Sequence, residues 1–254
     1  MSLSLSVAAL NIILGLVYTS YGLMTIVDLK RDWRFRGVSH FGLAWIAMAF
    51  TCGPHHLDHG LQFASVGGNA GPLDVMAVVI GMPAGVIWFL LRVEALNGGR
   101  GDRFISGTPP WLKALTWAGV LYALVLAASV AVVMRQPVHF TPRLTPNLLL
   151  LGLYFLIGFY LLRTQLANRA TTGGWSVSGV ALTIIFPTCG VMHAMYMVYA
   201  STGRYAVEWH CLVIDWLAVP AAIYFVWVVR NLSMGVSSDW NDGATGAKLQ
   251  AAAS

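Results

Sequence analysis

Two short motifs with the same residue types carry most of the chemistry that this sequence offers. Cys52 stands four residues before His56, and Cys189 stands four residues before His193. Residues at positions i and i+4 lie on one face of a helix, so each motif points a thiol and an imidazole in the same direction. A thiolate and an imidazole in a dry site suit a soft metal, either Cu(I) or Zn(II). These four residues are therefore the predicted metal ligands, in one shared site or in two.

Neighbouring side chains favour copper and add further candidate ligands. Met48 lies one turn before Cys52, and Met192 is next to His193; thioethers are soft ligands that zinc seldom uses. The remaining candidate accessory residues are His55, His59, Asp74, His210 and Asp215. Asp215 lies within an apolar segment, where an acidic side chain is energetically costly and is a candidate functional group by default. Together these groups predict an acidic, imidazole-rich region that could collect metal cations.

The elements that must position these residues are membrane-spanning helices. Of the 254 residues, 57% are hydrophobic and 10% are charged, whereas an ordinary soluble domain has about 25% charged residues. This composition excludes a soluble globular protein, a disordered chain and nucleic-acid binding as the main task. Stretches of roughly 20 apolar residues predict transmembrane helices. They lie at 7–28, 41–63, 73–95, 111–134, 146–166, 176–199 and 208–230.

The basic residues are distributed unequally over the predicted loops. Of the 15 Lys and Arg residues, only Arg135, Arg143 and Arg204 fall on the side where the first helix begins. The positive-inside rule then places the N-terminus outside and the C-terminus in the cytoplasm, and we expect a plasma membrane of bacterial type. The polar C-terminal segment 233–254 is predicted to be a disordered cytoplasmic tail.

The sequence repeats itself at a spacing of 137 residues. Thr51-Cys52-Gly53 recurs as Thr188-Cys189-Gly190, and the same offset pairs Gly15 with Gly152, Ser39 with Ser176 and Pro83 with Pro220. Apolar helices aligned by chance would match Leu and Ala, but they would rarely match Cys, His and Pro in one register. The third cysteine, Cys211, has no counterpart in the other half and is interpreted as a packing residue.

This repeat predicts an arrangement of three, one and three helices. The first three-helix unit covers residues 1–95, a connecting fourth helix with its loops covers 96–145, and the second unit covers 146–232. A three-span unit ends on the side opposite its start, so the fourth helix restores the orientation before the second copy begins. The two units are then parallel and related by a pseudo-two-fold axis along the membrane normal.

The Cys-Gly-x-x-His element, late in the second span of each unit, is similar to the copper-binding element of the ethylene-receptor transmembrane sensor. That family also has tyrosines in its first span, here Tyr18 and Tyr21, followed by a basic, aromatic loop. The resemblance covers residues 7–95 and again 146–230, and it implies Cu(I) held by Cys52 with His56 and by Cys189 with His193. It differs from the family pattern in lacking an acidic residue in the first span and in fusing two units. No kinase follows them.

The resemblance implies a sensor-like or copper-handling protein with a small apolar ligand at the metal. Any signal would pass to a membrane or cytoplasmic partner protein, and enzyme activity is not expected. Two other interpretations stay open. A seven-span zinc hydrolase of the ceramidase and adiponectin-receptor group would use a zinc-activated water. Its ligands would come from His55 or His59, His193, His210 and Asp74. A b-type haem would use a histidine pair such as His56 and His193.

Overall fold

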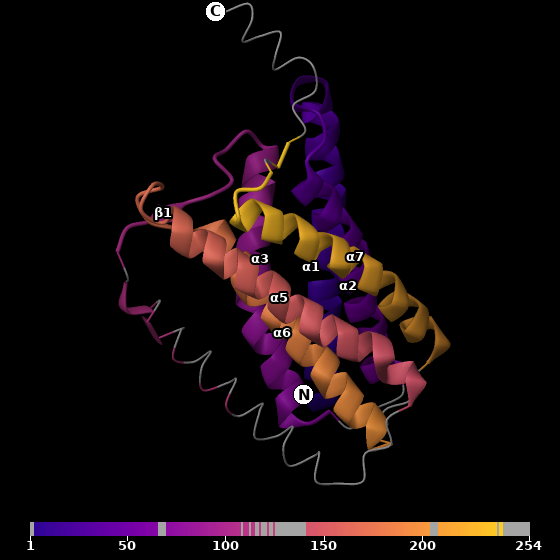
Figure 1. Cartoon of the computed structure of the whole chain (residues 1–254). Helices are drawn as coiled ribbons and strands as arrows, with labels where there is room; N and C mark the ends of the chain where they lie inside the picture. The colour runs from indigo at the N-terminus through magenta and orange to yellow at the C-terminus, as the bar shows by residue number, and fades with distance from the viewer. Residues whose placement is uncertain are drawn as a thin grey trace, which may run out of the picture.

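Long α-helices make up most of the described chain. The computed structural model describes residues 3–65, 70–107, 141–203, 208–237 and 239–240, with isolated positions between 109 and 124. The helices in these ranges are α1 (Leu3–Arg36), α2 (His40–Ser65), α3 (Pro72–Leu96), α5 (Thr145–Asn168), α6 (Val177–Ser201) and α7 (Trp209–Ser233). A 3-10 turn, η1 (Pro142–Leu144), leads into α5, and two short strands, β1 (Phe104–Ile105) and β2 (Trp175–Ser176), pair antiparallel. The predicted all-α class is confirmed for this part of the chain (Figure 1).

Four helical segments are long and apolar enough to cross a bilayer, as expected of a multi-pass membrane protein. They are Leu3–Arg34, Pro142–Asn168, Val177–Ser201 and Trp209–Ser233. Large apolar side chains on their outer surfaces, such as Leu16, Leu156 and Leu217, are at least 45% exposed, which suits contact with lipid. The predicted spans 41–63 and 73–95 coincide with α2 and α3, whereas most of 111–134 lies outside the described residues.

The helices run beyond the apolar stretches from which they were predicted. The first span was expected at 7–28, but α1 has 34 residues and continues through the basic segment from Lys30 to Arg36. The helix is longer than the predicted span because intrahelical hydrogen bonding does not stop where the apolar run stops. A helix can therefore leave the hydrocarbon region and continue into the aqueous layer.

The helices pack within each half of the chain, and two pairs join the halves. α1 contacts α2 and α3, α5 contacts α6 and α7, α2 contacts α7, and α3 contacts α6. Glycines allow α1 and α2 to approach closely, because a Cβ atom at Gly53 would lie 2.9 Å from the backbone nitrogen of Thr19. The aromatic core lies between the two halves, where Trp45 stacks on Trp88 with ring centroids 5.0 Å apart.

The start of α2 is capped by a residue from the far end of the chain. The Asp239 side chain accepts hydrogen bonds from the backbone N–H of Phe41 and from the hydroxyl of Ser39, both at 2.8 Å. The guanidinium of Arg36 lies 4.2 Å from the ring centroid of Trp240. The first part of the segment 233–254 is therefore held against α2, which differs from the disordered tail expected there, and residues 241–254 lie outside the described ranges.

The start of α6 is capped in the same manner from the segment after α3. The Asp102 side chain accepts a hydrogen bond from the backbone N–H of Ser178 at 2.9 Å and one from the hydroxyl of Ser176 at 2.6 Å. Both caps satisfy N–H groups that have no partner within the helix. The starts of α2 and α6, and the ends of α3 and α7, thus lie at one end of the bundle, called here the capped end.

The helix α5 begins far from the capped end. Asn147, in its first turn, hydrogen-bonds to His193, which comes 16 residues after Val177 and so lies about 24 Å along α6. Since α3 ends at the capped end, the chain between Leu96 and Thr145 connects opposite ends of the bundle.

Candidate metal centre

Four polar side chains from four helices meet inside the bundle. His55 comes from α2, Asn147 from α5, His193 from α6 and Asp215 from α7, and each is at most 7% exposed. Asn147 joins two of the others, because its amide donates to Asp215 Oδ2 at 2.7 Å and its Oδ1 lies 2.6 Å from His193 Nδ1. The rings of His55 and His193 are in contact, with centroids 4.9 Å apart.

One oxygen of this cluster lacks a hydrogen-bond donor among the described residues. Asp215 is 1% exposed, and its Oδ1 lies 3.1 Å from His55 Nδ1 without the alignment of a hydrogen bond. Two atoms bound to one zinc ion at about 2.1 Å each would be about 3.0–3.5 Å apart. Ligand atoms of His55, His193 and Asp215 all lie within 4.8 Å of one another. We call these three residues the buried centre.

The hydrogen bonds also determine which imidazole nitrogen is available for a metal. Because the Asn147 amide nitrogen donates to Asp215, its oxygen faces His193, and Nδ1 of that ring must carry the proton. The lone pair of His193 is then on Nε2. Metal-binding histidines usually donate their other N–H to a fixed acceptor in this way.

The second histidine of the two sequence motifs has an equivalent partner. His56 Nδ1 lies 2.8 Å from Asn11 Oδ1, and the Asn11 amide donates to the carbonyl of Val7 at 2.9 Å. His56 therefore has the same tautomer as His193. Its side chain is 3% exposed, but it belongs to no group of three candidate metal ligands within the described ranges.

A small cavity adjoins the buried centre. It has a volume of about 30 Å³, and its walls include His59, Asp74, Met192 and Tyr196. The ring of His59 lies 4.8 Å from that of His55, centroid to centroid, and is 8% exposed. The cavity could therefore hold a water molecule beside the His59 imidazole, next to the buried centre.

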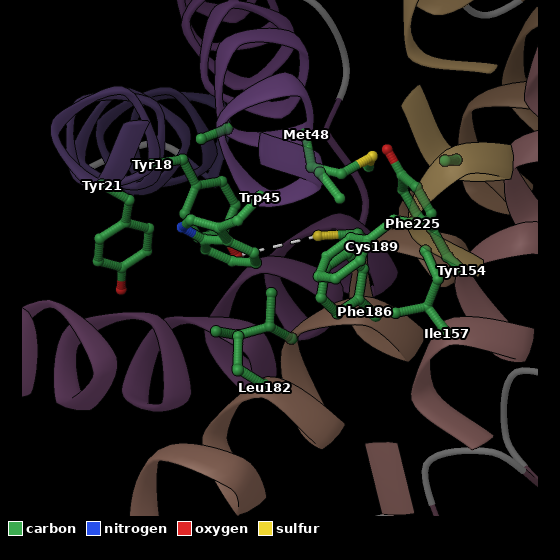
Figure 2. Packing of buried hydrophobic residues seen from close by; sticks show 14 of the residues in the cluster. Tyr18, Tyr21, Trp45, Met48, Tyr154, Ile157, Leu182, Phe186, Cys189 and Phe225 are labelled. Atoms are coloured by element: carbon green, nitrogen blue, oxygen red, sulfur yellow. Dashed lines mark hydrogen bonds between the residues drawn. The ribbon is translucent and has the colours of Figure 1, made fainter. Parts of the chain in front are cut away.

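The two motif cysteines lie together in a different place. Cys52 and Cys189 line one narrow cavity, together with Met48 and the aromatic rings of Tyr18, Trp45 and Phe186. The Cys52 sulfur lies 3.1 Å from the hydroxyl of Tyr154, and the Cys189 sulfur lies 3.9 Å from that of Tyr18. Figure 2 shows the sulfur atoms of Met48 and Cys189 near the aromatic rings that surround this cavity.

The structure thus divides the predicted ligand set. His193 lies in the buried centre with His55 and Asp215, whereas the two cysteines share a cavity with Met48. The other accessory candidates are also divided, since His59, Asp74 and Met192 line the adjoining cavity and His210 belongs to a separate group with Asp58 and Cys211.

Sequence reasoning missed the two asparagines that hold the imidazoles. The signal that could have identified them is a polar side chain inside an apolar span, which is also the feature that singled out Asp215. Asn11 and Asn147 are 136 residues apart, one residue out of register with the repeat, so the comparison of the two halves did not pair them. No family model, curated protein or solved structure shows significant similarity to this chain.

Proposed function

We propose that this chain is a seven-span membrane protein built from two parallel three-helix units. The helix contacts support this, because they are the same in both units. α1 contacts α2 and α3 as α5 contacts α6 and α7, and α3 contacts α6 as α7 contacts α2. The helix caps support it as well, since Asp102 and Asp239 are 137 residues apart and cap α6 and α2 in the same manner. Neither aspartate contributed to the repeat recognised in the sequence.

The positions of the chain ends support a fourth span between the units. The segment from Leu96 to Thr145 joins opposite ends of the bundle, which in a membrane requires an odd number of crossings. With the excess of Lys and Arg at the capped end, this end faces the cytoplasm of a bacterial-type cell. The buried centre then lies toward the outer side.

The function that the geometry supports best is binding of a divalent metal at the buried centre. The observation that carries this proposal is the buried Asp215 Oδ1, which has no hydrogen-bond donor in the described residues and lies 3.1 Å from a histidine nitrogen. A buried carboxylate oxygen without a donor is costly, and a cation between Oδ1 and the imidazoles would remove that cost. Two imidazoles and a carboxylate are ligands of zinc-type ions rather than of Cu(I).

This ligand set favours the hydrolase alternative for the buried centre. Three protein ligands leave the fourth position of a tetrahedral zinc ion to water, and zinc would supply a more acidic bound water there. His59 would be the candidate general base, because its ring contacts that of His55 and lines the neighbouring cavity. The haem alternative does not fit, because the ring of His55 contacts those of both His56 and His193, and a porphyrin between them would displace it.

Metal analysis of the purified, detergent-solubilised chain tests the proposal. We expect zinc at the buried centre, and the isosteric variant Asp215→Asn should lose it because an amide is a poor zinc ligand. Asp74→Asn is the matched control, since Asp74 lines the neighbouring cavity but lies outside the buried centre. Full zinc occupancy in Asp215→Asn, or equal loss in both variants, would contradict the assignment.

A specific observation also keeps Cu(I) as a second candidate ligand at a separate site. Two thiols and the Met48 thioether line one cavity, and these are the ligand types that Cu(I) prefers. The aromatic walls would suit the small apolar ligand implied by the ethylene-receptor resemblance. We expect anaerobic Cu(I) titration to detect one tight site that the double variant Cys52→Ser/Cys189→Ser lacks. Unchanged Cu(I) binding in that variant would remove this candidate.

A further inference from the structure

A second group of candidate ligands lies one helical turn from the buried centre. Asp58 on α2 faces His210 and Cys211 on α7, and ligand atoms of the three residues lie within 4.8 Å of one another. Asp58 Oδ1 is 2.9 Å from His210 Nε2, and the Cys211 thiol donates to Asp58 Oδ2 at 2.5 Å. We call these residues the outer group.

The outer group and the buried centre are stacked along the same two helices. Asp58 comes three residues after His55, and Cys211 comes four residues before Asp215, which places the outer group about 5 Å farther from the capped end. Two of the three residues of the outer group are more exposed than the buried centre, whereas Cys211 is 1% exposed. The Asp215 side chain is 1% exposed, whereas those of Asp58 and His210 are 19% and 40% exposed.

The chemistry of the outer group suits a divalent cation of borderline softness. A thiolate, an imidazole and a carboxylate are all zinc ligands, and together they also favour Cd²⁺. A cation bound there would replace the thiol proton that Cys211 now shares with Asp58. The Gln62 amide lies 3.0 Å from both the Cys211 sulfur and Asp58 Oδ2, so it could hold these ligands in position.

We propose that Asp58, His210 and Cys211 form a loading site, through which a zinc-type cation passes from the outer aqueous side to the buried centre. This inference rests on the proposed function, because it assigns a destination to the cation. The step between the two sites is about 5 Å along α2 and α7, so it requires no large movement of the helices. The loading site would raise the rate of metal uptake, and the buried centre would set the final occupancy.

Cadmium tests whether the site exists. The chain has three cysteines, so in the variant Cys52→Ser/Cys189→Ser the only thiol is Cys211. We expect Cd²⁺ to produce an ultraviolet thiolate-to-metal charge-transfer band in this variant. Adding Cys211→Ser should remove the band while the far-ultraviolet circular dichroism stays unchanged. Absence of the band in the double variant would overturn the site, and the thiol would be a hydrogen-bond donor to Asp58 alone.

Uptake kinetics test the role of the site. Zinc binding to the metal-free full-length chain is followed in a rapid-mixing experiment with a zinc-sensitive dye. We expect His210→Ala and Cys211→Ser to slow occupation of the buried centre about tenfold, because each variant removes one of the three ligands that would hold the cation at the entry. The final occupancy should not change. Uptake at the original rate in both variants would overturn the loading role.

The variant Asp215→Asn separates failure of this inference from failure of the proposed function. If both proposals hold, this variant loses zinc from the buried centre but keeps the cadmium band of the outer group. If the buried centre holds no metal, zinc binding is unaffected by Asp215→Asn although the cadmium band is still present. If only the loading site fails, the band is absent and Asp215→Asn still loses its zinc.

Discussion

At the scale of single residues, Asn147 links the two halves of the buried centre. Its amide donates to Asp215 and its oxygen accepts from His193, and the side chain is fully buried. We predict that Asn147→Ala lowers zinc affinity about 10- to 100-fold, because the carboxylate loses a donor and the imidazole loses the acceptor that fixes its tautomer. Competition with a chromophoric chelator measures this affinity.

Asn11→Ala provides the matched control for this prediction. Asn11 is 1% exposed and holds His56 in the same manner, yet His56 is not part of the buried centre. The control should cost stability, about 1–3 kcal/mol for the lost buried partner, while zinc affinity stays within a factor of about two. An equal fall in affinity for both variants would mean that the loss reflects general loosening of the helices.

The residue types of the site were predictable from the sequence, but their grouping was not. The i, i+4 spacing put Cys52 and His56 on one face of α2, and that inference needs only helix geometry. Four residues also correspond to about 6 Å along the helix axis, enough for the thiol and the imidazole to meet different neighbours. Those neighbours, Tyr154 for the thiol and Asn11 for the imidazole, come from other helices, whose rotation the sequence does not specify.

At the scale of elements, glycines determine how closely α1 can approach α2. A Cβ atom at Gly53 would overlap the Thr19 hydroxyl oxygen and lie 2.9 Å from the Thr19 backbone nitrogen, so one of the helices must move. We predict that Gly53→Ala destabilises the protein by about 1–3 kcal/mol, as overpacking usually does. Unfolding in mixed detergent micelles with increasing dodecyl sulfate measures the free energy.

Gly152→Ala is the corresponding control on α5. No atom lies within 4 Å of a Cβ built there, although Gly152 is the repeat counterpart of Gly15. Its substitution should leave stability unchanged or raise it slightly, since alanine favours helix by up to about 1 kcal/mol. A similar loss for both variants would show that close approach of α1 and α2 is not the cause.

The caps of α2 and α6 lead to a second prediction at this scale. Asp102→Ala removes the acceptor for the backbone N–H of Ser178 and the hydroxyl of Ser176, and should cost about 1 kcal/mol. Asp239→Ala should cost a similar amount at α2. Asp32→Ala is the control, because the exposed pair of Asp32 with Arg36 at 3.6 Å should contribute less than about 0.5 kcal/mol. Equal unfolding free energies for all three variants would contradict the capping role.

The sequence predicts which segments form helices, but it does not predict where the helices end. Apolar runs of about 20 residues located the six described helices, and four of these are long and apolar enough to cross a membrane. The ends depend on partners elsewhere in the chain. Asp239 caps a helix that begins about 200 residues earlier, and this contact also orders the start of the segment that was predicted to be a disordered tail.

At the scale of the whole molecule, each of the two proposed units depends on the other. The third helix of one unit packs on the second helix of the other, as α3 does on α6 and α7 on α2. The contacts of the motif cysteines also join the two units, since the Tyr18 hydroxyl of α1 lies next to the Cys189 sulfur of α6. A single unit would expose the polar groups of its half of the buried centre to lipid, where they are costly. Fusion of the two copies keeps these surfaces covered.

The proposed seven-span topology yields the last prediction, which concerns the two ends of the connecting segment. Ser106 lies near the capped end and Thr141 precedes α5 at the opposite end, and both are exposed. In a chain with its native cysteines replaced by serine, a membrane-impermeant maleimide should label Thr141→Cys in intact cells. It should label Ser106→Cys only after the membrane is opened. This pattern is required if the chain crosses the membrane an odd number of times between the two positions and if the capped end is cytoplasmic. Labelling of both positions from one side would remove the fourth span, whereas the reversed pattern would keep that span and invert the orientation inferred from the basic residues.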